Sequence, residues 1–394
     1  MNEINIFETK NKYLINGKIV YKEGGEDIIE YGTTEIKPKA YENNTYIVSV
    51  VLPRTVTSIG YYAFDGCSNL TSIIIPNSVT RICDGAFRGC TSLKSIAIPE
   101  GITMIGKSTF SGCNSLTSIT IPKGVRSIGE FAFSDCSSLE RITLPETITW
   151  IGQYAFNGCS SLESIIIPEG VTEIGNDTFS HCTSLTSIII PEGVAKIGAG
   201  AFYDCNSLTS IAIPESVKEI SCNPFSGCKF KIYVSPKNKY FKVIDNNLYS
   251  IDGKRIISYI PKENETEFSI SDSVTLIGEG AFHSCSSLTS ITIPEGVASI
   301  GKFAFLFCSS LTSITIPEGV TEIGNATFSD CNSLTSITIP KSVTSIGKYA
   351  FDDCTSLKDV YFNGKKSQWE SIAKDVSFLK NTKIHFKGLF GYTK

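Results

Sequence analysis

The chain has 394 residues, of which 19% are charged, and a formal net charge of −4. This mild acidity argues against a nucleic-acid partner, because binding to phosphates needs a basic stripe of side chains. No run of 18 or more apolar residues occurs, and the N-terminus lacks a basic region followed by an apolar core, so we expect neither a membrane span nor a signal peptide in this sequence.

Residues 1–30 precede the regular part of the chain, and we expect them to form an N-terminal hairpin cap. The segment Tyr13–Tyr21 carries Asn16-Gly17 at its centre, a pair that favours the two-residue type I′ turn of a hairpin. The terminal coil of a stacked array exposes one apolar side, which such a cap would cover.

From residue 31 a unit of 23 residues repeats, and a fixed period of this length indicates a solenoid whose coils touch only their neighbours. The first repeat is degenerate, because Asn44 stands where later repeats have cysteine. The repeat phase is set by two residue types: prolines at 53, 76, 99, 122, 145, 168, 191, 214, 294, 317 and 340, and cysteines at 67, 90, 113, 136, 159, 182, 205, 228, 285, 308, 331 and 354.

Two short strands are expected in each coil, as the segment from Pro122 to Leu144 illustrates. Leu139, Ile142 and Leu144 have the spacing of a strand with one apolar side, and the proline that follows ends it because proline has no N–H for the ladder. Val125 and Ile128 indicate a second, shorter extended segment.

The corner between these strands should be apolar inside. Ala132, Cys136 and Leu139 are spaced so that a brief helical turn would bury all three, with Phe133 as the large core side chain. The predicted fold class is therefore a repeat solenoid, mainly β with short helical or 3-10 turns.

The unit resembles the BspA-like leucine-rich repeat family with 23-residue repeats. The resemblance rests on segments such as CSSLTSITIPEGVASIGKFAF at 285–305 and CNSLTSITIPKSVTSIGKYAF at 331–351, and it covers roughly residues 31–362. It implies a right-handed coil of about 13 repeats, curved or elongated, in a secreted or cell-surface binding protein of the adhesin type. A repeat fold does not by itself fix a function.

The repeat phase breaks once. Cys285 follows Cys228 by 57 residues, which is two repeats and 11 extra residues. Asp252-Gly253 predicts a hairpin within this interval. We therefore expect a first array at 31–235, a hairpin-containing island at 236–271 and a second array at 272–362, the island being either a plain interruption or a binding insert.

Residues 363–394 are expected to form a C-terminal cap. Ser367 and Glu370 have the spacing of a capping box that would open a short helix ending at Ala373, and Thr382–Phe386 alternates like a final strand. Trp369 is expected to cover the apolar side of the last coil.

The cysteines permit a disulfide, a metal or a packing interpretation. Neighbouring coils are close enough for bridges, but ladder side chains run parallel rather than toward each other. No Cys-x-x-Cys occurs, and three histidines are too few for zinc clusters. We expect the twelve ladder cysteines to be free, buried and reduced, as in a reducing habitat, and Cys83 and Cys222, which lie off the ladder, to be the more reactive thiols.

Motifs for catalysis are absent or out of context. The segment Gly101–Ser108 matches a phosphate loop, but its glycines belong to the repeat and its isoleucines to the core. His181 and His283 are expected on solvated turns. Aspartates before ladder cysteines (Asp135, Asp204, Asp330 and Asp353) supply too few oxygens for calcium. We predict no enzyme, no catalytic residue, no metal and no cofactor.

Two surfaces are candidates for binding. One is the hydroxyl-rich outer side of the long ladder, represented by Thr120, Thr292, Thr315 and Thr338. The other is a set of aromatic residues near one corner of the coils, comprising Tyr62, Phe131, Tyr154, Phe303, Phe307 and Tyr349, with which we group Trp150 of the second extended segment. Exposed aromatic groups of this kind mark interaction sites, unless they pack on neighbouring coils.

The predicted function is a non-enzymatic module that binds a protein or glycan, such as a host or extracellular-matrix component, as a surface or secreted monomer. The alternatives are a structural spacer and an intracellular interaction scaffold in the cytoplasm. The free thiols and the absence of a signal sequence favour the scaffold.

Overall fold

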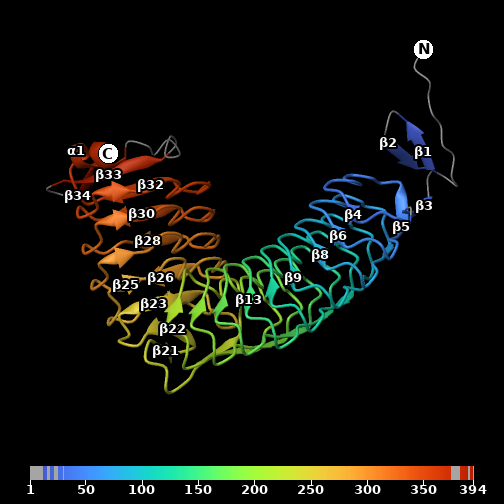
Figure 1. Ribbon diagram of the computed structural model, residues 1–394. Helices are drawn as coiled ribbons and strands as arrows, with labels where there is room; N and C mark the ends of the chain where they lie inside the picture. The colour runs from blue at the N-terminus through green and yellow to red at the C-terminus, as the bar shows by residue number, and fades with distance from the viewer. Residues whose placement is uncertain are drawn as a thin grey trace, which may run out of the picture. The chain divides into compact units, whose positions relative to one another are not determined.

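The structure is a computed structural model that describes residues 12–15, 18–21, 25–29, 31–373, 382–388 and 391–393. The chain forms two compact units, residues 1–197 with 205–208 and residues 198–204 with 209–394. Each unit is a β-solenoid in which successive coils stack along the chain (Figure 1). None of the described residues belongs to a helix long and apolar enough to cross a membrane.

Most coils contribute to two parallel ladders, because the unit places buried residues at fixed positions; the coil at residues 93–98 forms no long-ladder strand. In the first unit the long ladder pairs Ile119 with Ile142, one repeat apart, and leaves the flanking hydroxyl residues exposed. Its long-ladder strands are β3 (Gly25–Ile28), β5 (Ile47–Val51), β7 (Ser72–Ile74), β10 (Ser118–Thr120), β12 (Arg141–Thr143), β14 (Ser164–Ile166) and β16 (Ser187–Ile189). Its short-ladder strands are β4 (Glu35–Ile36), β6 (Ser58–Ile59), β8 (Arg81–Ile82), β9 (Met104–Ile105), β11 (Ser127–Ile128), β13 (Trp150–Ile151), β15 (Glu173–Ile174) and β17 (Lys196–Ile197).

The second unit repeats this design. Its long-ladder strands are β18 (Ser210–Ile213), β20 (Lys231–Val234), β24 (Glu267–Ser269), β26 (Ser290–Thr292), β28 (Ser313–Thr315), β30 (Ser336–Ile339), β32 (Asp359–Phe362), β33 (Lys383–Gly388) and β34 (Gly391–Thr393). Its short-ladder strands are β19 (Glu219–Ile220), β25 (Leu276–Ile277), β27 (Ser299–Ile300), β29 (Glu322–Ile323) and β31 (Ser345–Ile346).

The corner is where the sequence prediction needs correction. No helical turn forms over Ala132–Leu139; the segment consists of hydrogen-bonded turns. The N–H groups of Phe131, Phe133 and Asp135 donate to carbonyls of the next coil, while those of Ala132 and Cys136 donate three residues back. Alternate N–H groups therefore join the coils, which a helix would not allow. Ala132, Cys136 and Leu139 are buried as predicted.

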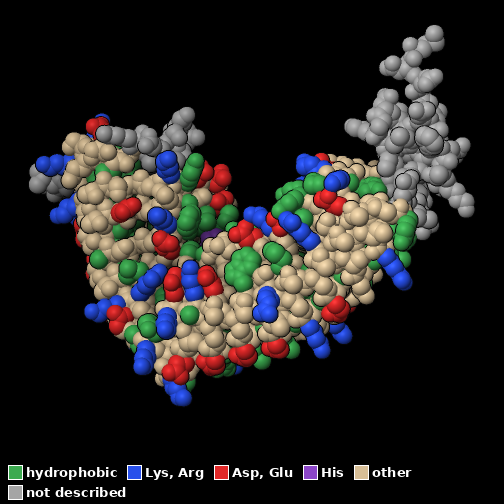
Figure 2. Space-filling view, in the orientation of Figure 1, with side chains coloured by type: hydrophobic (Ala, Val, Ile, Leu, Met, Phe, Trp, Pro, Cys, Tyr) green, Lys and Arg blue, Asp and Glu red, His purple; other side chains and the backbone are tan. Residues whose placement is uncertain are grey.

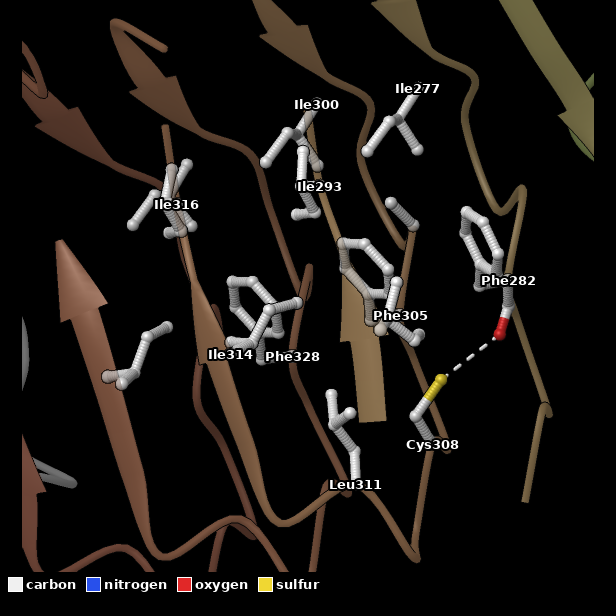
Figure 3. Close-up of a cluster of buried hydrophobic side chains, with 14 of the residues drawn as sticks. Ile277, Phe282, Ile293, Ile300, Phe305, Cys308, Leu311, Ile314, Ile316 and Phe328 are labelled. Carbon is white, nitrogen blue, oxygen red and sulfur yellow. Dashed lines mark hydrogen bonds between the residues drawn. The ribbon is translucent and has the colours of Figure 1, made fainter. Parts of the chain in front are cut away.

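The core is a column of rings, one from each coil. The repeats supply seven of these rings in the first unit and six in the second, in agreement with about 13 repeats: Tyr41, Phe64, Phe87, Phe110, Phe133, Phe156 and Phe179, then Phe202, Phe225, Phe282, Phe305, Phe328 and Phe351. The interrupted segment adds Tyr259, which is buried and stacks on Phe282 with centroids 5.2 Å apart. Adjacent rings are nearly parallel, as in Phe305 on Phe328, whose centroids are 5.3 Å apart (Figure 3). Because each ring packs on the rings of neighbouring coils, no coil can bury its core alone.

The ladder cysteines are free, as predicted, and they do more than fill space. The thiol of Cys308 donates to the carbonyl of Phe282, 3.1 Å away in the preceding coil (Figure 3). The same bond recurs along both units, for example from Cys136 to the carbonyl of Phe110 at 3.1 Å. Burial raises the pKa of the Cys136 thiol to about 12, so the thiolate that would react is suppressed.

The expected reactivity of Cys83 is not supported. Its side chain is buried, and burial raises the pKa of its thiol despite the nearby Arg81. Cys222 is half-buried. Of the two cysteines off the ladder, only Cys222 therefore keeps partial exposure to a reagent.

The interrupted segment forms a meander rather than a coil corner. β21 (Phe241–Ile244), β22 (Asn247–Ser250) and β23 (Arg255–Ser258) pair antiparallel in sequence order, and the β22–β23 hairpin encloses Asp252-Gly253 as predicted. The β21–β22 turn at Asp245-Asn246, with both residues at positive φ, was not predicted. β23 then pairs parallel with β25, so the meander continues the short ladder.

Both ends of the chain carry the elements expected from the sequence. β1 (Lys12–Ile15) and β2 (Lys18–Tyr21) pair antiparallel, while the turn residues Asn16-Gly17 lie outside the described residues. At the other end β33 pairs parallel with β32. The hairpin and the final strand are therefore both present.

The C-terminal helix begins earlier than predicted. Helix α1 spans Lys366–Ile372 with Lys365 as its N-cap, because the Gln368 side chain accepts the N–H of Lys365 at 2.9 Å. The capping box predicted at Ser367 is wrong. Trp369 is buried, with its ring 5.4 Å from that of Phe362, and it covers the last coil as expected.

Candidate functional site

Each corner turn except the one at Asn223 contains two positions with positive backbone φ, and these positions form two columns along the coils. The first left-handed column consists of Lys39, Tyr62, Gly85, Ser108, Phe131, Tyr154 and Asp177 in the first unit, and of Gly200, Gly280, Phe303, Ala326 and Tyr349 in the second. The second left-handed column consists of Asn43, Gly66, Gly89, Gly112, Asp135, Gly158 and His181, and of Asp204, Gly227, Ser284, Phe307, Asp330 and Asp353.

The second left-handed column explains the residue before each ladder cysteine. Glycine, asparagine and aspartate are the residues that tolerate positive φ best, and they fill most of this column. Asp135, Asp330 and their equivalents are therefore selected by the backbone rather than by a metal. Within the described ranges no group of three or more histidine, cysteine or acidic side chains is placed to hold a metal ion.

The first left-handed column is unusual because aromatic residues occupy it. Phe131, Tyr154 and Phe303 have φ of 56°, 58° and 60°, where a residue with a Cβ is strained by about 1–2 kcal/mol. Glycine avoids this strain and stands at the same position in other coils, such as Gly85 and Gly280. The backbone therefore does not require the aromatic residues.

In the first unit the column rings are partly covered. Phe131 and Tyr154 stack with centroids 4.7 Å apart, and the Lys107 ammonium lies 5.7 Å from the Phe131 ring centre. Burial and a hydrogen bond to Asp177 raise the pKa of Tyr154. Lys107, Phe131, Tyr154 and Asp177 thus form a continuous, half-exposed row across adjacent coils.

Tyr62 lies farther toward the N-terminus in the same column. A Cβ on Gly85 would lie 2.4 Å from Cδ1 of Tyr62, so the tyrosine ring covers this glycine. The guanidinium of Arg88 lies 5.3 Å from the ring centre and also forms a bidentate pair with Asp65. The Tyr62 ring therefore packs against residues of its own unit.

In the second unit the corner rings are more open. Phe303, Phe307 and Tyr349 expose 37%, 44% and 64% of their surface. Phe303 and Tyr349 belong to the first left-handed column and Phe307 to the second, with its ring 5.6 Å from His283. Figure 2 shows a short row of hydrophobic side chains at one edge of this unit, with acidic side chains beside it.

Trp150 is not a corner residue. It lies in β13, and its side chain is 47% exposed. Ser127 of β11 pairs with Trp150 on one side and with Met104 of β9 on the other. Trp150 and Met104 are exposed apolar side chains of the short ladder, separated by Ser127, and Trp150 lies four residues before the corner position of Tyr154.

The hydroxyl-rich ladder contains two kinds of threonine. Thr312 and Thr335 donate their hydroxyls to carbonyls of the preceding coil, at 3.1 and 3.0 Å, so these groups already serve the fold. Thr315 and Thr338 are neighbours in β28 and β30 on the outer face, where Thr315 is exposed and Thr338 half-buried. Thr120 and Thr292 hold the same position in β10 and β26.

This outer face also carries apolar side chains. Ile166 and Ile189 are neighbours in β14 and β16 and are 79% and 78% exposed. The candidate hydroxyl surface is thus interrupted by an apolar pair in the first unit.

His283 was expected on a solvated turn, and the structure corrects this. Its ring is half-buried between Tyr203 and Phe307, at centroid distances of 5.4 and 5.6 Å. Nδ1 contacts the hydroxyls of Ser226 and Ser284. Burial lowers the pKa of His283 to about 4, so the imidazole is neutral at physiological pH.

The environment of His283 arises because the interrupted segment adds no corner turn. The side-chain amide of Asn223 donates to the carbonyl of Gly280 at 2.9 Å, so the coil before the interruption contacts the coil after it at this outer part of the corner. In the core the N–H of Tyr259, from the interrupted segment, donates to the carbonyl of Ala281 at 2.9 Å. The sequence shows only that 57 residues separate Cys228 from Cys285. It does not show that the corner turns of these two coils are neighbours.

The phosphate-loop match has no supporting context. Ile102 and Ile105 are buried in the core, and Ser108 belongs to the first left-handed column. Turns rather than a helix follow it. A phosphate loop needs a helix N-terminus at this point, so the match is a product of the repeat.

Comparison with protein families finds the BspA type leucine rich repeat region, in six copies, matching residues 27–140, 103–232 and 259–383. Comparison with curated proteins finds no relative. A leucine-rich cell surface protein of Faecalibacterium prausnitzii A2-165 is similar in structure, with a TM-score of 0.57 and 28% identity, covering 95% of this chain and 99% of that one. A leucine-rich repeat protein of Bacteroides ovatus ATCC 8483 gives a TM-score of 0.51 and 28% identity, covering 98% of both chains.

Proposed function

We propose, from the premise that the chain belongs to the BspA-type leucine-rich repeat family, that it is a non-enzymatic module that binds a macromolecule at a cell surface. The observation that carries the proposal is the presence of aromatic residues in the first left-handed column. Phe131, Tyr154, Phe303 and Tyr349 occupy strained positions that glycine fills elsewhere. Strained residues of this kind persist where they serve a function.

A comparison of backbone strain with the free energy gained by ring stacking supports this interpretation. Two aromatic residues at positive φ cost about 1–2 kcal/mol each, whereas one stacked pair such as Phe131 and Tyr154 returns about 0.5–1.5 kcal/mol beyond its burial. Compared with glycine, the strain therefore cancels much of what the stacking of the two rings contributes, which leaves mainly their partial burial. Tyrosine and tryptophan are also preferred anchors of protein interfaces.

The surface location is supported by the similar protein of Faecalibacterium prausnitzii, which is described as a cell surface protein. The ligand class is a protein or glycan of the surroundings, such as an extracellular-matrix component. Both the aromatic corner and the outward threonines are long enough surfaces for such a ligand, because each follows the coil stack at about 4.8 Å per coil.

The test is a binding screen of the full chain against extracellular-matrix proteins and glycans. Two double variants are compared, Trp150→Ala with Tyr154→Ala, and Thr315→Ala with Thr338→Ala. We expect a ligand whose affinity falls at least about tenfold in the aromatic variant, as for interface anchors, and stays unchanged in the threonine variant.

The reverse result would move the site to the hydroxyl-rich ladder. A ligand affected by neither variant would argue against both surfaces and turn attention to residues 236–271. Absence of any ligand would favour a structural spacer.

A further inference from the structure

The second unit contains a gap of one ring in its first left-handed column. Phe303, Ala326 and Tyr349 occupy this position in three successive coils, with φ of 60°, 47° and 60°. The N–H of Phe303 donates to the carbonyl of Asn325 at 3.1 Å, and that of Ala326 to the carbonyl of Lys348 at 2.9 Å, so these coils are directly stacked. Similar backbone conformations give the three side chains similar starting directions.

The core of the same coils shows what a complete column looks like. Two residues farther along each coil stand Phe305, Phe328 and Phe351, stacked at 5.3 and 5.5 Å with interplanar angles of 2° and 9°. The first left-handed column, here called the outer column, has a ring, a methyl group and a ring at these three positions. The core column, here called the inner column, has three rings. Two coil steps separate Phe303 from Tyr349 by roughly 10 Å, which places a third ring about 5 Å from each, within the usual stacking range.

The outer rings are not covered by their own unit. Phe303 and Tyr349 are 37% and 64% exposed, and within residues 31–373 neither ring contacts another ring or a cation. This contrasts with the first unit, where Tyr154 and Lys107 cover Phe131. Ala326, at the base of the gap, is half-buried.

The surroundings of the gap define the chemistry of an occupant. Lys302 and Lys348 directly precede Phe303 and Tyr349, both are exposed, and within residues 31–373 neither forms an ion pair. Asn325 lies between them and accepts the N–H of Lys348 at 3.0 Å. On the far side of the corner the second left-handed column carries Asp330 and Asp353. The lysine side therefore attracts carboxylates next to an inserted apolar group.

From these observations we infer that Phe303, Ala326 and Tyr349 form a subsite for one aromatic side chain of a partner polypeptide, with acidic residues beside it facing Lys302 and Lys348. The inserted ring completes the outer column as Phe328 completes the inner one. An aromatic ring is favoured over a sugar ring, because both of its flat faces would stack, one on Phe303 and one on Tyr349. The inference rests on the proposed binding function and specifies the ligand class of one part of the surface.

The test uses two synthetic peptides with blocked ends that differ only at the central residue, Gly-Asp-Glu-Trp-Glu-Asp-Gly and its leucine counterpart, titrated against the full chain by calorimetry. We expect the tryptophan peptide to bind about tenfold more tightly, because two stacking contacts replace simple apolar burial. Ala326→Phe fills the gap with the chain's own ring and should abolish this preference. Ser108→Phe, in the first unit at the same column position, is the matched control and should leave the preference unchanged.

A second variant guards against a folding defect in Ala326→Phe. Phe303→Ala removes one wall of the gap without adding volume, and we expect it to reduce the preference for tryptophan several-fold. Equal affinity for both peptides, no binding at millimolar concentration, or a preference that survives Ala326→Phe would overturn the inference. Binding of a neutral oligoglucose that Ala326→Phe abolishes would also overturn it, because the gap would then hold a sugar.

These outcomes are separable from the proposed function. If the peptides show no preference while the ligand screen still yields a partner that depends on Trp150 and Tyr154, the subsite is wrong and the binding function stands.

Discussion

Replacing Phe305 with alanine should lower the free energy of unfolding of the second unit by about 3–5 kcal/mol, the usual cost of truncating a buried aromatic residue. Phe305 is fully buried, and its ring stacks on Phe282 and Phe328 at 5.3 Å on both sides. Denaturant unfolding, followed by hydrogen exchange of amides in the flanking coils, measures the effect.

Phe303→Ala is the matched control for this prediction. Phe303 lies two residues away in the same turn, but it is exposed and has positive φ. Alanine keeps the Cβ and therefore the backbone strain, so the variant loses only the packing of a ring that is 37% exposed. We expect a loss of about 1–2 kcal/mol, well below that of Phe305→Ala. Equal losses in the two variants would contradict the division into an inner structural column and an outer binding column.

The second large effect is a pH dependence that originates at His283. Its pKa is lowered by burial from the ordinary value of 6.5 to about 4, so between these values the unfolded chain binds a proton that the folded chain excludes. The contribution of His283 to the free energy of unfolding is therefore fully present above pH 6.5 and is lost as the pH falls toward 4. At about 1.4 kcal/mol per pH unit the loss approaches about 3 kcal/mol.

His283→Gln isolates this contribution, because glutamine does not titrate while carboxylates elsewhere titrate equally in both proteins. The free energy of unfolding should fall more steeply from pH 7 to pH 4.5 in the wild type than in the variant, by about 2–3 kcal/mol in total. Parallel pH profiles would show that His283 accepts a proton in the folded protein, contrary to its packing between Tyr203 and Phe307.

The ladders could be predicted from sequence because they depend on side-chain type at fixed spacing. Leu139, Ile142 and Phe133 recur every 23 residues, and each is buried where the pattern placed it. The corner could not be predicted in the same way. Its hydrogen bonds alternate between the same coil and the next, and the spacing of Ala132 and Cys136 is equally compatible with a helical turn.

A signal for the corner was nevertheless present in the sequence. Glycine and aspartate are the commonest residues directly before the ladder cysteines, and this mixture is typical of positive φ. The first left-handed column gave no such signal, because Tyr62, Ser108, Phe131 and Asp177 share no residue type. Aromatic residues there became informative only when their backbone conformation was known.

His283 illustrates a second limit. Its contacts with Ser226 and Tyr203 connect residues separated by the interrupted segment, and no local pattern indicates that this segment bypasses the corner. The start of helix α1 illustrates a third limit of sequence prediction. Ser367 and Gln368 both have side chains that can cap a helix, and only the structure shows that the Lys365 N–H bonds to Gln368.

The most direct measurement of the central claim compares stability and binding in one variant, Phe131→Gly with Tyr154→Gly. Glycine relieves the strain at two positive-φ positions while removing the stacked rings, so the free energy of unfolding should change by less than about 1 kcal/mol. Affinity for the ligand found with the wild-type chain should fall at least about tenfold. A variant that loses several kcal/mol of stability but binds as before would contradict the account, because the rings would then serve the fold and not the ligand.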